Sequence, residues 1–110
     1  MERLVKGDVV VLPFPFSDLS ASKKRPAVVA ATLPGDDIIL CQVTSVERKD
    51  DYAIPLKEKD FAVGKLPVES VIRPSRLFTA EKSIVIYKAG SLAKSKIKEV
   101  EQMIVKIMTQ

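Results

Sequence analysis

The side chains that most often carry enzyme chemistry are scarce in this chain of 110 residues. Histidine is absent and Cys41 is the single cysteine. Without histidine the chain lacks the commonest general base at neutral pH, and a zinc site is not expected. A magnesium site built from carboxylates alone stays open, although no cluster of Asp and Glu stands out. We therefore expect no metal and no other cofactor, and we predict that Cys41 is a buried core thiol.

Lysine and arginine side chains are the remaining candidates for a functional role. The 18 Lys and Arg residues outnumber the 14 Asp and Glu residues, which gives a net charge of +4. This balance suits an acidic partner such as RNA or an acidic protein segment, although many small basic proteins bind neither. Lys23 and Lys24 lie at the end of a predicted exposed loop, residues 17–24, and the Arg25–Pro26 step closes that loop.

Short strands must position these basic residues. Apolar, β-branched runs predict strands at 9–12, 27–32 and 38–43, and a turn at 34–37 makes the last two a hairpin. Shorter strands are predicted at 52–56, 68–73 and 83–88, separated by a charged connection at 47–51, a loop at 61–67 and a break at 74–78. The alternate prolines Pro13 and Pro15 place residues 13–16 at a strand end or an edge.

The end of the chain changes period. Apolar residues recur every three to five positions from Leu92 to Ile107, which predicts one amphipathic helix over about 93–108. Short strands with Gly/Pro turns and one terminal helix predict a mainly β fold, a small barrel in a single domain, 1–110. The chain has no apolar run long enough for a transmembrane helix and starts with charged residues, so we expect no membrane contact and a cytoplasmic location.

Four blocks of residues, in a fixed order, resemble a known protein family. They are Gly7–Val10 with Leu12–Ser20 and Lys24–Val29; Val43–Thr44–Ser45; Gly64–Pro67 with Ser70–Arg73 and Arg76–Phe78; and Gly90–Ser91–Leu92. The set resembles the MazF/PemK family, whose members are toxins of type II toxin–antitoxin pairs. A lone Gly-Asp or Arg-Pro step is a weak signal, but the ordered set extends over nearly the whole chain.

The resemblance implies an SH3-like barrel of the CcdB/MazF type with a C-terminal α-helix, usually paired as a homodimer. It implies a growth-inhibiting endoribonuclease that cleaves single-stranded RNA at short sequences without a metal and is silenced by a cognate antitoxin. The residues held responsible in the family fall on Arg25 and Thr44. The chain departs from the family in the loop before Arg25, which lacks a Glu-Gln pair, and at Ala93, where a helix-capping serine or similar residue is frequent.

Arg25 and Thr44 suit the chemistry that the resemblance implies. RNA supplies its own nucleophile, because the 2′-hydroxyl can attack the adjacent phosphorus and leave a 2′,3′-cyclic phosphate and a 5′-hydroxyl. The planar fork of arginine binds phosphate oxygens in pairs, and a threonine hydroxyl can donate to the developing negative oxygen, a contribution of roughly 3–4 kcal/mol. The structural alternatives are a solvated charge at a loop end for Arg25 and an ordinary strand-forming residue for Thr44.

Six further residues are candidates for RNA binding: Phe16, Lys23, Lys24, Ser45, Arg73 and Arg76. The lysines would add nonspecific attraction to phosphate, or would only be solvated charges of a loop. The arginines would contact the substrate or a partner, or would be plain surface charges. Phe16 would stack on a base, although phenylalanines at strand spacing, such as Phe14 and Phe16, more often belong to a core.

Two other functions stay open at this point. One is a gyrase-poisoning toxin of the CcdB type, which shares the barrel and hydrolyses nothing. The other is a silent SH3-like binding module. The Arg25–Pro26 step and Thr44 favour the ribonuclease. The expected partners are single-stranded RNA, a second copy of the chain and a cognate antitoxin, whose acidic segment we expect in the same basic groove as RNA. The terminal helix is expected to pack on the barrel.

Overall fold

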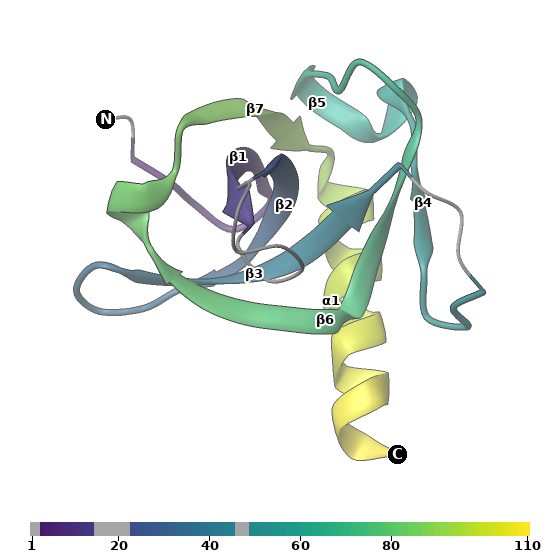
Figure 1. The fold of residues 1–110 in the computed structure, drawn as a ribbon. Helices are drawn as coiled ribbons and strands as arrows, with labels where there is room; N and C mark the ends of the chain where they lie inside the picture. The colour runs from purple at the N-terminus through teal and green to yellow at the C-terminus, as the bar shows by residue number, and fades with distance from the viewer. Residues whose placement is uncertain (1–2, 15–22, 46–48) are drawn as a thin grey trace.

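The computed structural model describes residues 3–14, 23–45 and 49–110. In this part of the chain, seven strands form one antiparallel sheet in the order β4-β6-β3-β2-β1-β7-β5. The sheet curls into a half-barrel and α1 packs against it (Figure 1). The predicted mainly β barrel with a C-terminal helix is confirmed. The elements are β1 (Asp8–Phe14), β2 (Lys23–Thr32), β3 (Asp37–Thr44), β4 (Ile54–Leu56), the 3-10 helix η1 (Glu58–Asp60), β5 (Phe61–Gly64), β6 (Ser70–Glu81), the 3-10 helix η2 (Lys82–Ile84), β7 (Tyr87–Leu92) and α1 (Lys94–Thr109).

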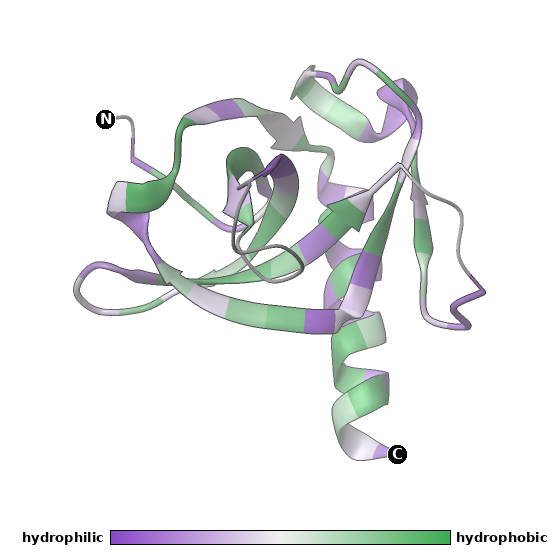
Figure 2. Cartoon of the chain, in the orientation of Figure 1, coloured by the Kyte–Doolittle hydropathy of each residue, from purple (hydrophilic) through white to green (hydrophobic). Residues whose placement is uncertain are grey.

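The three central strands are buried on both faces, which explains why their apolar residues follow one another without alternation. One face carries Val10, Val29 and Leu40, which share a core with Phe14 and Phe78. We call it the first face. The other face, which we call the helix face, carries a second core that includes Val100 of α1. Figure 2 shows continuous hydrophobic stretches along these strands. The strands predicted at 9–12, 27–32 and 38–43 are confirmed.

Strand β6 is longer than the sequence predicts. The predicted strand at 68–73 and the break at 74–78 are replaced by one strand of 12 residues. Cys41 of β3 pairs with Leu77 and the next residue, Gln42, pairs with Arg73, so residues 74–76 bulge out of the ladder. Pro74 is tolerated there because a bulged residue donates no ladder hydrogen bond. Pairing with β3 on both sides of the bulge therefore outweighs the local break signal.

Other predicted boundaries are wrong for the same reason. The loop predicted at 61–67 begins with a strand, β5, which pairs with β7. The strand predicted at 83–88 is instead η2 followed by β7, and the strand predicted at 52–56 is shortened to β4. Lys23 and Lys24, predicted in a loop, begin β2, because they pair with Phe14 and Pro13 of β1. The composition of these short segments does not indicate where their strands begin and end. Hydrogen bonds to neighbouring strands decide it.

The contact between β5 and β7 depends on two glycines. Gly64 pairs with Gly90 across the ladder. A Cβ atom added at Gly90 would overlap the carbonyl oxygen of Val63, and one added at Gly64 would overlap that of Ala89. Gly64 also has a φ of 76°, which favours glycine. This close approach of two backbones explains glycine at both positions.

Helix α1 confirms the periodicity of the sequence and packs on the barrel as predicted. Val100 is buried in the helix-face core, and Ile97, Met103 and Ile104 pack against the same core. Lys96 ties the helix to η1, because its Nζ lies 3.6 Å from an oxygen of Asp60. Among the described residues, no helix combines the length and apolar content needed to cross a membrane.

Candidate active site

Arg25 of β2 and Thr44 of β3 lie at the same end of the sheet. Ala27 pairs with Gln42, and this antiparallel register, continued by two residues, places Arg25 opposite Thr44. Opposite residues share a face, and side chains alternate along a strand. Arg25 and Thr44 therefore both belong to the first face. Arg25 is half-buried and Thr44 is 6% exposed. The cation and the hydroxyl suggested by the sequence are thus neighbours by register.

The first face changes from apolar to polar toward this end of the sheet. Leu40 pairs with Phe78, and the ring of Phe78 meets that of Phe14 edge to face at 5.1 Å between centroids. One step further along β3, on the same face, Gln42 pairs with Arg73, and after it comes Thr44. A polar row of Arg25, Gln42, Thr44 and Arg73 therefore borders the apolar core that contains Phe14 and Phe78.

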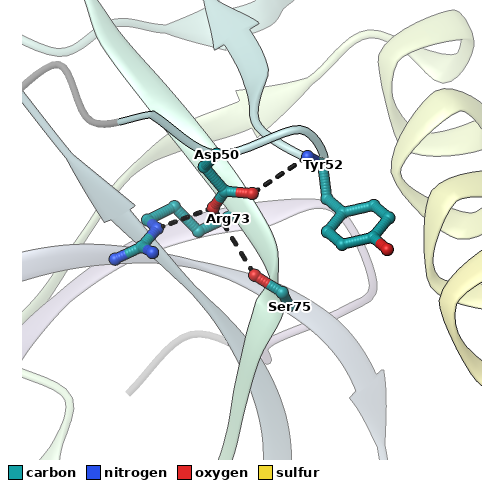
Figure 3. A network of polar contacts seen from close by, with 4 residues as sticks. All are labelled: Asp50, Tyr52, Arg73 and Ser75. Carbon is teal, nitrogen blue, oxygen red and sulfur yellow. Dashed lines mark hydrogen bonds and ion pairs between the residues drawn. The ribbon is translucent and has the colours of Figure 1, made fainter.

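Arg73 is held by a carboxylate from a different segment (Figure 3). Asp50 lies in the connection between β3 and β4, and its Oδ2 accepts a hydrogen bond from Arg73 Nε at 3.0 Å. The same oxygen accepts from Ser75 Oγ at 3.5 Å, while Oδ1 accepts from the backbone N–H of Tyr52 at 2.9 Å. The side chains of Arg73 and Asp50 are only 13% and 6% exposed. The pair is therefore largely shielded from water.

These contacts favour the charged form of Asp50. The hydrogen bond from the Tyr52 N–H, followed by the hydrogen bond and charge of Arg73 and the hydroxyl of Ser75, lowers its pKa below the usual value of 3.8, against the opposing effect of burial. Asp50 is therefore a carboxylate at neutral pH. A group of this kind accepts hydrogen bonds strongly and takes up a proton poorly, so it suits orientation of a neighbour better than general-base work.

The other predicted RNA-binding residues lie around this row. Lys23 is exposed at the start of β2 and alternates onto the first face with Arg25, whereas Lys24 alternates onto the opposite face. Ser45 is exposed directly after Thr44. Arg76 is exposed within the bulge of β6. Phe16 lies outside the described residues, and Phe14 is a core residue that is 6% exposed.

Two side chains that could take part in a reaction have structural roles instead. Asp8 is 1% exposed, and its carboxylate accepts hydrogen bonds from the Val5 N–H at 2.8 Å and Ser91 Oγ at 3.0 Å and pairs with Lys88 at 3.3 Å. It ties the segment before β1 to β7. Cys41 is fully buried, as predicted, and burial raises its pKa to about 12, so its thiol is a poor nucleophile. Within the described ranges, no three Cys, Asp or Glu side chains gather as a metal site requires.

Sequence reasoning missed Asp50, Gln42 and Ser75. Gln42 sits inside an apolar run and Ser75 inside the bulge, so neither carries a local signal. Asp50 belongs to a run of charged residues, and only its turn-forming contact with Tyr52 is local. Its partner Arg73 is 23 residues away, and the fold of β6 back onto β3 brings the two together.

The family of the chain follows from a match to a family model. The model, described as "PemK-like, MazF-like toxin of type II toxin-antitoxin system", matches residues 5–108. The chain belongs to this family of toxins. The resemblance carried by the sequence blocks is therefore confirmed, and so is the likeness of the fold. Among curated proteins, none matches the sequence.

Several solved structures share this fold at low sequence identity. An endoribonuclease from a mycobacterial species, in complex with its cognate antitoxin, has a TM-score of 0.76 at 10% identity and matches 96% of this chain and 95% of that chain. MazF from Deinococcus radiodurans has a TM-score of 0.74 at 18% identity over the whole of both chains. The Mycobacterium tuberculosis toxin MazF-mt6 has a TM-score of 0.71 at 16% identity, over 92% of this chain and 95% of that chain.

Proposed function

We propose that this toxin is an endoribonuclease that cleaves single-stranded RNA at short sequences without a metal and so inhibits growth. The observation that carries the proposal is the register that brings Arg25 and Thr44 to one end of the first face. Membership of the toxin family supports it, as does the likeness to a protein described as an endoribonuclease. The row offers planar cations and a hydroxyl, which suit a phosphate diester.

The reaction is an attack of the 2′-hydroxyl on the adjacent phosphorus. A bond forms between the 2′-oxygen and phosphorus, the bond to the 5′-oxygen breaks, and the products are a 2′,3′-cyclic phosphate and a 5′-hydroxyl. The 2′-oxygen loses a proton and the leaving oxygen gains one. Arg25 binds the phosphate oxygens and neutralises their charge, and Thr44 donates a hydrogen bond to the oxygen whose charge grows. Lys23, Lys24, Ser45, Arg73, Arg76 and Phe16 bind the flanking RNA.

The proposal includes two protein partners. A cognate antitoxin with an acidic segment binds the same basic surface, because that surface attracts carboxylates and phosphates alike. A protein of similar fold, described as an endoribonuclease in complex with its cognate antitoxin, supports the antitoxin as a partner. A second copy of the chain forms a homodimer; the strongly exposed Val105 and Met108 on α1 supply apolar surface that a partner could cover. We place the toxin in the cytoplasm, where its RNA substrates are.

Induced expression in a bacterial host tests the function against its alternatives. Wild type, Arg25→Ala and the matched control Lys98→Ala, which removes an exposed positive charge on α1, are compared. The proposal predicts growth arrest with shortened mRNA and intact DNA for wild type and Lys98→Ala, and normal growth for Arg25→Ala. Double-strand DNA breaks with intact mRNA would instead show a gyrase poison. Normal growth with wild type would show a silent binding module.

Competition tests the shared surface. A fluorescent RNA made uncleavable by 2′-O-methyl groups is bound to the toxin and titrated with the product of the neighbouring gene. The proposal predicts mutual displacement, weaker at high salt. Simultaneous binding of both without displacement would contradict a shared surface and would require inhibition at a distance.

A further inference from the structure

The Asp50–Arg73 pair is unusual for its position. Arg73 belongs to the polar row, yet its side chain is only 13% exposed and that of Asp50 only 6% exposed. The carboxylate comes from the connection between β3 and β4 and the guanidinium from β6. Three separate donors converge on the carboxylate: Arg73 Nε, Ser75 Oγ and the Tyr52 N–H. The backbone N–H of Tyr52 thus holds one oxygen of the Asp50 carboxylate, and the other oxygen faces Arg73.

The geometry of the pair leaves the two terminal nitrogens of the guanidinium without a bond to Asp50. Asp50 binds Nε, the nitrogen nearest the backbone, and the two terminal nitrogens of Arg73 point away from Asp50 (Figure 3). Arg73 pairs with Gln42 across the ladder, so it shares the first face with Arg25 and Thr44. A carboxylate on Nε restricts the rotation of the side chain and spares the paired donors that phosphate oxygens prefer.

The neighbouring charged residues show what an unrestrained side chain looks like in this region. Arg76, three residues along β6, is exposed, and none of the ion pairs among the described residues involves it. Asp51, next to Asp50, is also exposed. An exposed arginine loses more side-chain entropy on binding than one already held in place. Of the two arginines, Arg73 is therefore the pre-oriented one.

We propose that Asp50 is a positioning residue, which holds Arg73 through Nε so that its terminal nitrogens bind the phosphate backbone of the RNA that Arg25 and Thr44 cleave. This role rests on the proposed ribonuclease function. Asp50 itself touches no substrate, and it acts through Arg73. Misplacement of a substrate-binding group by about 1 Å can lower a rate on the order of 100-fold, so loss of the restraint is measurable.

A double-mutant cycle tests the coupling. Single-turnover rates of cleavage of a long unstructured RNA are measured for wild type, Asp50→Asn, Arg73→Ala, the double variant, and Asp51→Asn as a control with the same charge change. Affinity for the 2′-O-methyl form of the same RNA is measured in parallel. We expect each single variant to cleave on the order of 10- to 100-fold more slowly, the double variant to match Arg73→Ala alone, and Asp51→Asn to match wild type.

The outcomes separate this role from the function on which it rests. A purely structural role for Asp50 would reduce the fraction of active protein and leave the rate constant of that fraction unchanged. Losses that multiply in the double variant would show that Asp50 does not act through Arg73. Either result would overturn the proposal while the ribonuclease stands. Wild-type protein that leaves RNA intact would refute the ribonuclease, and the positioning role with it.

Side-chain NMR of the wild type gives a second measurement that needs no stable Asp50 variant. The Arg73 resonances are assigned by their loss in Arg73→Ala. We expect a slowly exchanging Nε–H signal that stays in place when the 2′-O-methyl RNA is added, while the terminal nitrogen signals shift. A rapidly exchanging Nε–H signal before RNA is added, or terminal signals that do not respond to RNA, would overturn the proposal.

Discussion

Replacement of Asp50 by asparagine tests the polar network through stability, independently of activity. Asparagine has nearly the same shape, but it has one acceptor oxygen where Asp50 has two. In the structure, one carboxylate oxygen accepts from the Tyr52 N–H at 2.9 Å and the other from Arg73 Nε at 3.0 Å. The amide can serve only one of these two donors, and its NH₂ group opposes the other. The variant therefore loses one hydrogen bond and the ion pair together.

The size of the loss follows from the kind of bond. A hydrogen bond between charged groups contributes about 1.5–3 kcal/mol. Because the variant keeps one of the two hydrogen bonds, we use the lower half of that range and expect the free energy of unfolding to fall by about 2 kcal/mol at neutral pH. Urea denaturation followed by circular dichroism measures it. Asp51→Asn, at an exposed carboxylate, should change stability by no more than about 0.5 kcal/mol.

The stability difference between wild type and Asp50→Asn should also depend on pH in a defined direction. The folded-state pKa of Asp50 is lowered from 3.8, so its contribution is fully present above that value and is lost as pH falls through the lowered pKa. The difference between wild type and Asp50→Asn should therefore be constant at neutral pH and shrink as the pH falls through the lowered pKa of Asp50. Equal stability at neutral pH, or a difference that persists unchanged in acid, would refute the assigned network.

Three further substitutions test other parts of the structure. Thr44→Val keeps the shape but deletes the donor, so single-turnover cleavage should slow about 10²- to 10³-fold with little change in RNA affinity; an unchanged rate would make Thr44 structural. Gly90→Ala should lower the free energy of unfolding by about 1–3 kcal/mol in urea, because its Cβ would overlap the Val63 carbonyl; wild-type stability would contradict the close approach. Ala93→Ser should raise it by about 1 kcal/mol, because Ala93 is an N-cap without a side-chain hydrogen bond; no gain would show that the N-terminus of α1 needs no cap.

The sequence predicted those helices and strands whose burial produces a pattern of apolar residues along the chain. The consecutive apolar residues of β1, β2 and β3 and the periodic ones of α1 report their packing directly. Strand β5 leaves no such pattern, because three of its four residues are exposed and its place is set by pairing with β7. The same holds for the bulge of β6, where local break signals coincide with continued pairing.

The sequence predicted the main residues of the candidate site. It did not predict the residue that holds Arg73 in place. Arg25 and Thr44 stand out through the family blocks, and the register makes them neighbours. Asp50 looks like any solvated charge in the sequence, because the contact that defines it joins two segments that come together only when β6 folds onto β3. Register between distant strands is a property of the whole sheet, and local composition does not encode it.

The identity of the RNA ends produced by purified protein tests the proposed chemistry most directly. Wild type and Arg25→Ala are incubated with a long unstructured RNA in excess EDTA, and the new ends are mapped. Attack by the 2′-hydroxyl predicts 2′,3′-cyclic phosphate and 5′-hydroxyl ends at a few short sequences with wild type, and intact RNA with a well-folded Arg25→Ala. Cleavage that requires added Mg²⁺, ends that carry a 5′-phosphate, or full activity without Arg25 would contradict it.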